Sequence, residues 1–365
     1  MKKICLIAQF PPPIHGLSKA VDTLYNSDLA EEFALEKVDI KDNKRILQTL
    51  SAIRRSDADL FYFTISQSRG GNLRDLLILR AVGERPCLIH LHGGYFRELL
   101  DQLPQWQKKA NYKALGKLRG AIVLSPSLRA IFRGLLPEEK IVVIPNCVDD
   151  VYLMSDEEWE EKLAGLPNRA VKHVLYLSHF IRTKGYPEVL EMARLEKERV
   201  EAGGERRFHF DFAGAFFEKR EERFFWRYIA ENDLQEYVTY HGVVDGDRKR
   251  ALLQGCDVFA LLTRYPKEGQ PISLLEAMGN GMVVVTTDHA GIGDLVADGV
   301  DGILISSREN PAKEAYEKIQ EVCFEEFQRR GRAKVMRDYR QRNYVESMKQ
   351  IFRDGTEPAL KAERG

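Results

Sequence analysis

The sequence predicts an α/β protein with two Rossmann-like, doubly wound domains, each a parallel sheet covered by helices on both faces. The chain has 365 residues, 44% of them hydrophobic, which is more than one core normally uses. Short β-rich apolar runs alternate with longer amphipathic stretches, as strands alternate with covering helices. An acidic, Gly/Pro-containing stretch between Asp150 and Val171 interrupts this alternation. We therefore expect an N-terminal domain over 1–160, a C-terminal domain over 170–340, and a last helix over 340–365 that packs back on the first domain.

Five strands are expected in each half of the chain, because each run is short, apolar and rich in β-branched or aromatic residues. In the first half they lie at 3–10, 59–65, 87–93, 120–125 and 140–146. In the second half they lie at 172–178, 208–214, 237–242, 256–262 and 281–287. Helices are expected over 16–33 and 186–200, and the charged segment from Glu309 to Arg353 is expected to be helical too.

Charge and cysteine content narrow the class of protein. Lys plus Arg and Asp plus Glu both number 55, so overall charge predicts no nucleic-acid or anionic-membrane partner, which leaves room only for a local patch. The five cysteines are scattered and form no Cys-x-x-Cys pair, which disfavours a disulfide framework and a zinc site. The apolar run near the N-terminus is too short to span a membrane and has no cleavage site of small residues. We expect a cytoplasmic protein whose first strand is buried.

Open α/β sheets bind ligands beyond the carboxyl ends of their strands, where loops lead into helices. After the first strand, the loop PPPIHGLSKA places Gly16 at the start of a helix, where a missing side chain lets the backbone approach a ligand. The alternative is an ordinary proline-rich connection. No G-x-G-x-x-G follows this strand, so the dinucleotide fingerprint is absent from its expected place.

Two histidines lie at the end of the strand 87–93. His90 and His92 are two residues apart and point to one face of the strand, which would permit a metal pair. No carboxylate or further histidine stands at ligand spacing nearby, so we expect His90 to be buried in the strand. His92 precedes two glycines at the end of the strand, and it is our candidate for a substrate contact.

Cations and carboxylates mark two loops of the second half. Arg182 and Lys184 stand close to the N-terminus of a predicted helix, where an anion such as phosphate would offset the unfavourable interaction with the helix dipole; ordinary solvated charges are the alternative. In EGQPISLLEAMGNG, a helix is expected to begin at Pro271, with Glu268 before it and Glu276 inside it. A buried, ionised Glu276 needs a donor, which a sugar's vicinal hydroxyls, an arginine or a backbone amide could supply.

Together these segments resemble the GT-B glycosyltransferases of family 4. The resemblance rests on E-x7-E from Glu268 to Glu276, on Lys184-Gly185, on the strand exit VIPNCVD and on HGVV from His241 to Val244, in this context and with EAMGNGMVVVTT. It runs over nearly the whole chain and is strongest from Val174 to Ile305.

The resemblance implies two Rossmann-like domains facing a cleft, with a nucleotide-sugar held by the C-terminal domain and the acceptor by the N-terminal domain. It implies that Glu276 binds the ribose hydroxyls, that Glu268 lies beside the donor sugar, and that Lys184 holds the leaving diphosphate. His92 matches the family's histidine near the reacting centre. The further donor contacts that it implies are the amides from Gly269 to Ile272 (with Gln270 and Pro271), Val243 and Val244 against the base, and Gly16 near the phosphates.

The resemblance also implies retention of anomeric configuration and no need for a metal or other cofactor. Many members carry an arginine five residues before the loop lysine, where this chain has His179. We expect Arg182 or His179 to take over that role.

The expected function is that of a retaining, hexosyltransferase-type enzyme. It would move a sugar from a UDP- or GDP-linked donor to a saccharide or lipid-linked acceptor in cell-surface polysaccharide or glycan synthesis. Two other interpretations stay open: a nucleotide-sugar epimerase or phosphorylase using the same two-domain cleft, and a non-catalytic ligand-binding protein with two lobes.

A basic stretch over 105–120 lies in the half expected to bind the acceptor. Lys108, Lys109, Lys113 and Lys117 stand in it at mixed helical spacing. The pattern fits a peripheral contact with anionic lipid headgroups at the inner face of a membrane, or with a lipid-diphosphate acceptor. It also fits an ordinary solvated helix face.

Overall fold

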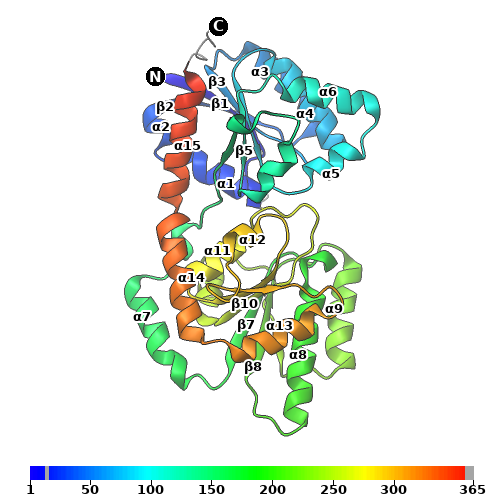
Figure 1. The fold of residues 1–365 in the computed structure, drawn as a ribbon, viewed down its shortest axis with the longest axis vertical. Coiled ribbons are helices and arrows are strands. Elements are labelled where there is room, and N and C mark those ends of the chain that lie inside the picture. The colour runs from blue at the N-terminus through cyan, green and yellow to red at the C-terminus, as the bar shows by residue number, and fades with distance from the viewer. Residues whose placement is uncertain (13–15, 358–365) are drawn as a thin grey trace. The chain divides into compact units, whose positions relative to one another are not determined.

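The computed structural model describes residues 1–12 and 16–357 (Figure 1). The chain divides into two compact units, the first formed by residues 1–146 with the segment from Gln341 onwards, and the second by Cys147–Arg340. Each unit contains one six-stranded sheet, and the paired strands of both sheets run parallel. The predicted α/β fold with two doubly wound sheets is confirmed.

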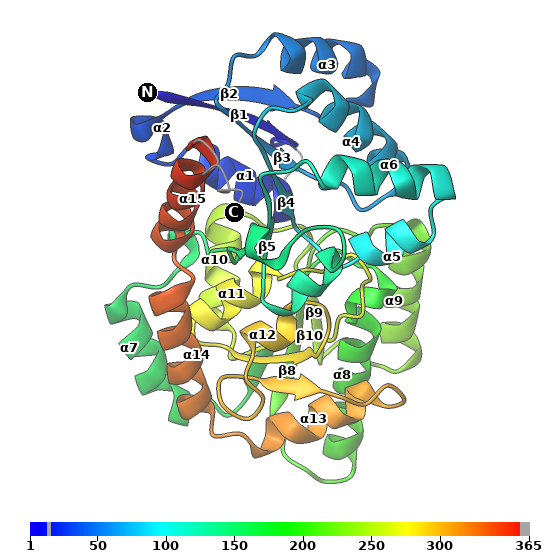
Figure 2. The ribbon, with the colours of Figure 1, turned by 45° about the horizontal axis from the view of Figure 1, so that its top comes forward.

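The sheet of the first unit has the order β2-β1-β3-β4-β5-β6. Its strands are β1 (Lys2–Ala8), β2 (Phe33–Asp39), β3 (Leu60–Thr64), β4 (Cys87–Leu91), β5 (Gly120–Val123) and β6 (Ile141–Val143). The α-helices of this unit are α1 (Gly16–Tyr25), α2 (Leu29–Glu32), α3 (Ile46–Arg55), α4 (Arg69–Val82), α5 (Phe96–Asp101), α6 (Gln105–Leu115) and α15 (Gln341–Thr356). Figure 2 shows α3, α4 and α6 on one side of this sheet and α1 with α15 on the other. Right-handed crossovers place α1 and α4 on opposite faces, because the chain moves in opposite directions along the sheet through these two helices.

The sheet of the second unit has the order β12-β11-β10-β7-β8-β9. Its strands are β7 (Lys172–Leu177), β8 (Phe208–Ala213), β9 (Val238–Tyr240), β10 (Val258–Leu261), β11 (Val283–Thr287) and β12 (Ile303–Ile305). The α-helices are α7 (Asp156–Gly165), α8 (Tyr186–Glu201), α9 (Lys219–Glu231), α10 (Gly246–Gly255), α11 (Ile272–Gly279), α12 (Ile292–Leu295), α13 (Pro311–Glu321) and α14 (Phe324–Asp338). Helix α13 packs beside α8, and α11 packs beside α14 (Figure 1).

The single helix expected over 16–33 is wrong. The chain forms α1, turns after Tyr25, forms the short α2 and enters the strand β2 at Phe33. β2 is an edge strand, and most of its side chains are only partly buried, so it lacks the continuous apolar run of the inner strands. Its sequence, FALEKVD, contains good helix formers, and this composition hid it.

The division between the units also differs from the expectation. It falls between Asn146 and Cys147, ahead of the segment 150–171 and the boundaries 1–160 and 170–340. The acidic stretch is not a linker, because it forms α7, whose buried Lys162 donates hydrogen bonds to the carbonyl oxygens of Cys256 (2.7 Å) and Asn280 (2.9 Å). These two contacts fasten α7 to the second unit.

The last described helix, α15, belongs to the first unit although the second unit precedes it in the chain. Phe352 is fully buried and meets the rings of Phe33 and Tyr62 edge to face, with centroids 6.0 and 5.6 Å apart. Arg353 binds Glu32 through both Nε and Nη2, each at 2.6 Å. Aromatic packing and a bidentate ion pair therefore hold α15 against the start of the first unit.

Candidate functional site

The sheet of the second unit has one topological switch point. From β7 the strand order continues through β8 and β9 on one side and through β10, β11 and β12 on the other. In open α/β sheets, ligands bind in the crevice beyond the carboxyl ends of the strands at such a point. The loops that follow β7 and β10 carry Lys184 and Glu268, so the sequence candidates lie in the loops that this rule singles out.

The two loops approach each other closely. The backbone N–H of Arg264 donates to the carbonyl oxygen of Thr183 at 2.6 Å. Gly185 has a φ of +86°, and a Cβ built on it would stand 2.5 Å from the carbonyl oxygen of Leu262. Only glycine fits this position, which is the N-cap of α8, and Lys184 stands directly before it.

Lys184 and Glu268 form an ion pair in this site. The lysine Nζ lies 3.3 Å from the Glu268 Oε2, and the two side chains are 17% and 10% exposed. Thr263 Oγ1 donates to the same carboxylate oxygen at 3.1 Å, and the Lys184 ammonium lies 5.1 Å from the centroid of the Tyr265 ring. The structure thus brings a cation and a carboxylate together just before α11.

Helix α11 begins one residue later than expected. Ile272 is its first residue and Pro271 is its N-cap, with φ −63° and ψ 122°. Proline has no N–H, so Pro271 offers no backbone donor at the start of this helix. Gly269 is held in place because its carbonyl oxygen accepts the backbone N–H of Gly291 at 3.0 Å.

Glu276 is buried inside α11, and its cation comes from another helix. Lys249 of α10 donates from Nζ to Glu276 Oε1 at 2.6 Å, and the side chains are 19% and 5% exposed. The same ammonium lies 4.1 Å from the centroid of the Tyr152 ring. Sequence reasoning missed Lys249, since nothing distinguishes it from the charges beside it in GDRKRALLQG.

The two candidates for the missing family arginine are placed differently from Lys184. The Arg182 Nε lies 3.2 Å from Glu221 Oε2, and its guanidinium stacks over the Phe224 ring at 4.1 Å, so α9 holds this half-exposed side chain. His179 is exposed. Partial burial lowers the pKa of His179, and the positive charge of Lys184 lowers it further, which favours the neutral imidazole.

The loop with Val243 and Val244 follows β9, and hydrogen bonds fix its beginning. The backbone N–H of His241 donates to the Phe212 carbonyl, and the N–H of Gly214 donates to the Gly242 carbonyl, both at 2.8 Å. Val243 is 66% exposed. An apolar side chain is therefore presented to solvent on a fixed backbone.

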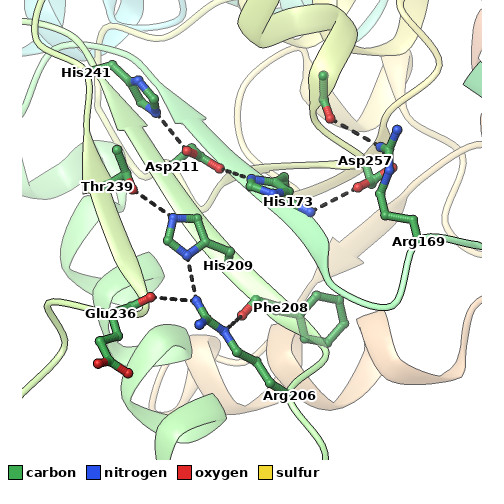
Figure 3. A network of polar contacts seen from close by, with 11 residues as sticks. Arg169, His173, Arg206, Phe208, His209, Asp211, Glu236, Thr239, His241 and Asp257 are labelled. Carbon is green, nitrogen blue, oxygen red and sulfur yellow. Dashed lines mark hydrogen bonds and ion pairs between the residues drawn. The ribbon is translucent and has the colours of Figure 1, made fainter.

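Behind this loop lies a buried carboxylate between two histidines (Figure 3). Asp211 of β8 accepts from His241 Nε2 at 2.7 Å and from His173 Nδ1 at 2.6 Å. Burial alone would raise the pKa of Asp211, but the two hydrogen bonds outweigh burial and hold it below its ordinary value. The same carboxylate raises the pKa of His173.

The remaining candidates belong to the first unit. Gly16 begins α1 and is exposed, and residues 13–15 of its loop lie outside the described residues. His90 is fully buried and its Nδ1 lies 2.7 Å from the Tyr62 hydroxyl, as expected for a strand residue; burial holds its pKa well below the ordinary value, and the neighbouring His92 adds to this shift. His92 follows β4 and stacks on His90, with ring centroids 3.9 Å apart.

Within residues 1–12 and 16–357, no group of three or more His, Cys, Asp or Glu is arranged to hold a metal ion.

Two family models match this chain. The model described as glycosyl transferases group 1 matches residues 157–340, which is about half of the chain and most of the second unit. The model described as glycosyltransferase family 4 matches residues 33–152.

The chain is similar to curated bacterial proteins. A colanic acid biosynthesis glycosyltransferase of Salmonella typhimurium is 27% identical over 262 residues, covering 64% of each chain, so this chain spans less than two thirds of that relative. Its counterpart from Escherichia coli is 29% identical over 305 residues, which is 79% of this chain and 68% of that protein.

Among solved structures, Anabaena HepE in complex with UDP superposes with a TM-score of 0.71 at 17% identity, over 96% of this chain and 100% of that one. A sucrose-phosphate synthase from Thermosynechococcus elongatus gives a TM-score of 0.71 at 15% identity, over 97% and 99% of the two chains. At these identities the likeness shows a shared fold.

Proposed function

The chain belongs to the glycosyl transferases of group 1, with the GT-B fold of family 4, and we propose that it is a retaining glycosyltransferase of polysaccharide synthesis. It moves a sugar from a UDP- or GDP-linked donor to a saccharide or lipid-linked acceptor. The observation that carries this proposal is the Lys184–Glu268 pair before α11 at the switch point of the second sheet. The solved structures with UDP and UDP-glucose in similar Anabaena chains support a nucleotide-sugar as donor.

In this proposal the donor lies along the carboxyl edge of the second sheet. Glu276 binds the ribose hydroxyls, which take the place of some of the hydrogen bonding that Lys249 gives it. Val243 and Val244 lie against the base, for which the exposed apolar side chain of Val243 is suited. The N–H groups of Gly269, Gln270 and Ile272 face the sugar or the phosphates at the positive end of α11.

The chemistry follows from the charge that bond breaking creates. Cleavage of the glycosyl–phosphate bond leaves positive charge on the sugar and adds negative charge to the diphosphate. Lys184 is held beside Glu268 before the reaction, so its charge needs little reorganisation to stabilise the leaving group, and such preorganised electrostatics is usually the largest catalytic effect. Attack on the face from which the diphosphate leaves gives retention, and Lys184 with the α11 amides replaces a metal ion. No other cofactor is proposed.

Arg182 is a weaker partner for the diphosphate than Lys184. Its guanidinium is already bound by Glu221 and Phe224, and reaching a phosphate costs those contacts. His179, with its lowered pKa, donates as a neutral imidazole.

The acceptor is proposed to bind the first unit, with His92 as the contact near the reacting centre and Gly16 as a point of close backbone approach. The basic stretch over 105–120 is proposed to make a peripheral contact with the cytoplasmic face of a membrane. All five cysteines are free, which fits a reducing compartment. None of the helices in the described part of the chain is both long and apolar enough to cross a bilayer.

The test is thermal stabilisation by UDP, GDP, ADP and NAD, with and without magnesium, in wild type and Glu276→Ala. A ligand that binds only the folded state raises the melting temperature. We expect one nucleoside diphosphate to stabilise the wild type without metal and to stabilise the variant much less. Stabilisation by NAD alone, or by none of the four, would overturn the proposal, and turnover of the donor without acceptor would point to an epimerase. Dependence on free phosphate would point to a phosphorylase, and binding without any turnover to a non-catalytic protein.

A further inference from the structure

A groove of about 920 Å³ runs between α4 and α6 in the first unit. Three large apolar side chains in its lining are exposed to solvent: Leu73 by 43%, Leu77 by 47% and Trp106 by 61%. Scattered exposed apolar residues are common on soluble proteins, but a group of large ones around a hollow marks a binding surface.

The two helices that form the groove are fixed to each other by buried amides. Asn72 of α4 donates from Nδ2 to Asn111 Oδ1, and Gln107 of α6 donates from Nε2 to Asn72 Oδ1, both at 2.8 Å. All three side chains are at most 4% exposed. Since a satisfied buried network holds its members in one geometry, the groove is preformed.

The groove is bordered by cations. Arg80, Lys113 and Lys117 line it, together with the acidic Glu84, which forms an ion pair with Lys117. The whole chain has 55 basic and 55 acidic residues, so this local excess of positive charge is not a consequence of a basic protein. Arg80 and Lys113 are both exposed.

We propose that the groove between α4 and α6 docks on an anionic lipid surface. Trp106, Leu73 and Leu77 enter the boundary between headgroups and acyl chains, and Arg80 and Lys113 contact lipid phosphates. An aromatic residue with an apolar body and a polar N–H suits that boundary, and apolar side chains combined with basic ones give binding that depends on anionic lipid. Charge complementarity therefore favours a membrane over a second, equally cationic copy of this surface.

This inference rests on the membrane contact proposed above. It locates that contact at the groove between α4 and α6 and names the apolar and basic side chains that make it. It does not depend on the identity of the donor. Nucleotide binding is therefore a separate readout, and the failure of one proposal is distinguishable from the failure of the other.

The experiment is co-sedimentation of the full chain with phosphatidylcholine vesicles, with and without phosphatidylglycerol. The test variants are Leu77→Gln/Trp106→Ala for the apolar part and Arg80→Glu/Lys113→Glu for the charged part. The matched controls in the same unit are Leu47→Gln, at a leucine that is 80% exposed outside the groove, and Lys44→Glu. The melting temperature of each variant without added ligand serves as the folding control, and stabilisation by nucleoside diphosphate is measured separately.

We expect binding only to the anionic vesicles, weakened by salt. Both test variants should lose roughly tenfold or more in vesicle affinity, since each basic residue near an anionic surface contributes roughly fivefold, whereas both controls bind as wild type. The tryptophan emission should shift to the blue on binding, and Trp106→Phe should abolish that shift. The proposal is overturned if the wild type ignores anionic vesicles, if the groove variants bind as tightly as the controls, or if they abolish self-association instead.

Discussion

Replacement of Lys184 by methionine tests the proposed mechanism most directly, because the lysine has two separable effects. It forms an ion pair with the largely buried Glu268, and it is proposed to stabilise the leaving diphosphate. Methionine keeps much of the length of the side chain and removes the charge.

The stability effect can be worked from the ion pair. At 3.3 Å and an effective dielectric constant of about 20, the attraction between Lys184 and Glu268 is about 5 kcal/mol before desolvation is subtracted. With side chains 17% and 10% exposed, the pair lies between exposed pairs, worth up to about 1 kcal/mol, and fully buried ones, whose disruption costs about 3–5 kcal/mol. We expect Lys184→Met to lower the free energy of unfolding by about 1–3 kcal/mol, measured by urea denaturation. The double variant with Glu268→Gln should lose less than the sum of the single variants.

The catalytic effect should be larger and of a different kind. Loss of one preorganised charge on the leaving group lowers the rate of the chemical step roughly 10²- to 10³-fold, with a smaller effect on KM. The assay is single-turnover transfer from whichever UDP- or GDP-sugar supports activity. The reasoning is refuted if Lys184→Met leaves the chemical step within about tenfold of wild type while the variant remains folded.

Three further predictions concern the second unit. Lys249→Met should raise KM for the donor more than it lowers kcat, because its partner Glu276 is proposed to hold the ribose; an unchanged KM in steady-state kinetics would contradict this. Gly185→Ala should lower the free energy of unfolding by about 2–4 kcal/mol more than Gly203→Ala. Both glycines have a positive φ, but only at Gly185 would the new Cβ meet a carbonyl oxygen, so equal losses in urea denaturation would contradict the role of that contact. Asp211→Asn should lower the free energy of unfolding most between about pH 4 and pH 6.5. The lowered pKa of Asp211 contributes stability above its ordinary value of 3.8, and the raised pKa of His173 contributes stability below 6.5 that is lost as the pH rises. A loss of stability that stays constant from pH 5 to pH 8 would contradict this assignment.

The sequence was sufficient for the inner parts of both sheets and for the loops that carry the candidate site. The inner strands are continuous apolar runs because both faces of a parallel sheet are covered, and this pattern is local and strong. The edge strand β2 was missed because most of its side chains are only partly buried. The edge strand β12 was missed as well.

Pairings between distant charges could not be predicted in the same way. Lys249 and Glu276 stand 27 positions apart on two different helices, and only the fold brings them together. Arg182 and Lys184 stand two positions apart in a short 3₁₀ turn, yet Arg182 forms an ion pair with Glu221 of α9 and Lys184 forms one with Glu268. The spacing of residues in the sequence indicates which residue types a site contains, whereas the packing of the fold decides which charged side chains pair with one another.

The return of α15 to the first unit has a consequence for how the polypeptide is made. During synthesis, the residues of the first sheet leave the ribosome long before Phe352, which closes over Phe33 and Tyr62. Until the whole second unit has been translated, that aromatic surface lacks its native cover. The nascent first unit is thus completed last, and residues 1–146 expressed alone would need α15 supplied as a separate peptide to reach the native packing.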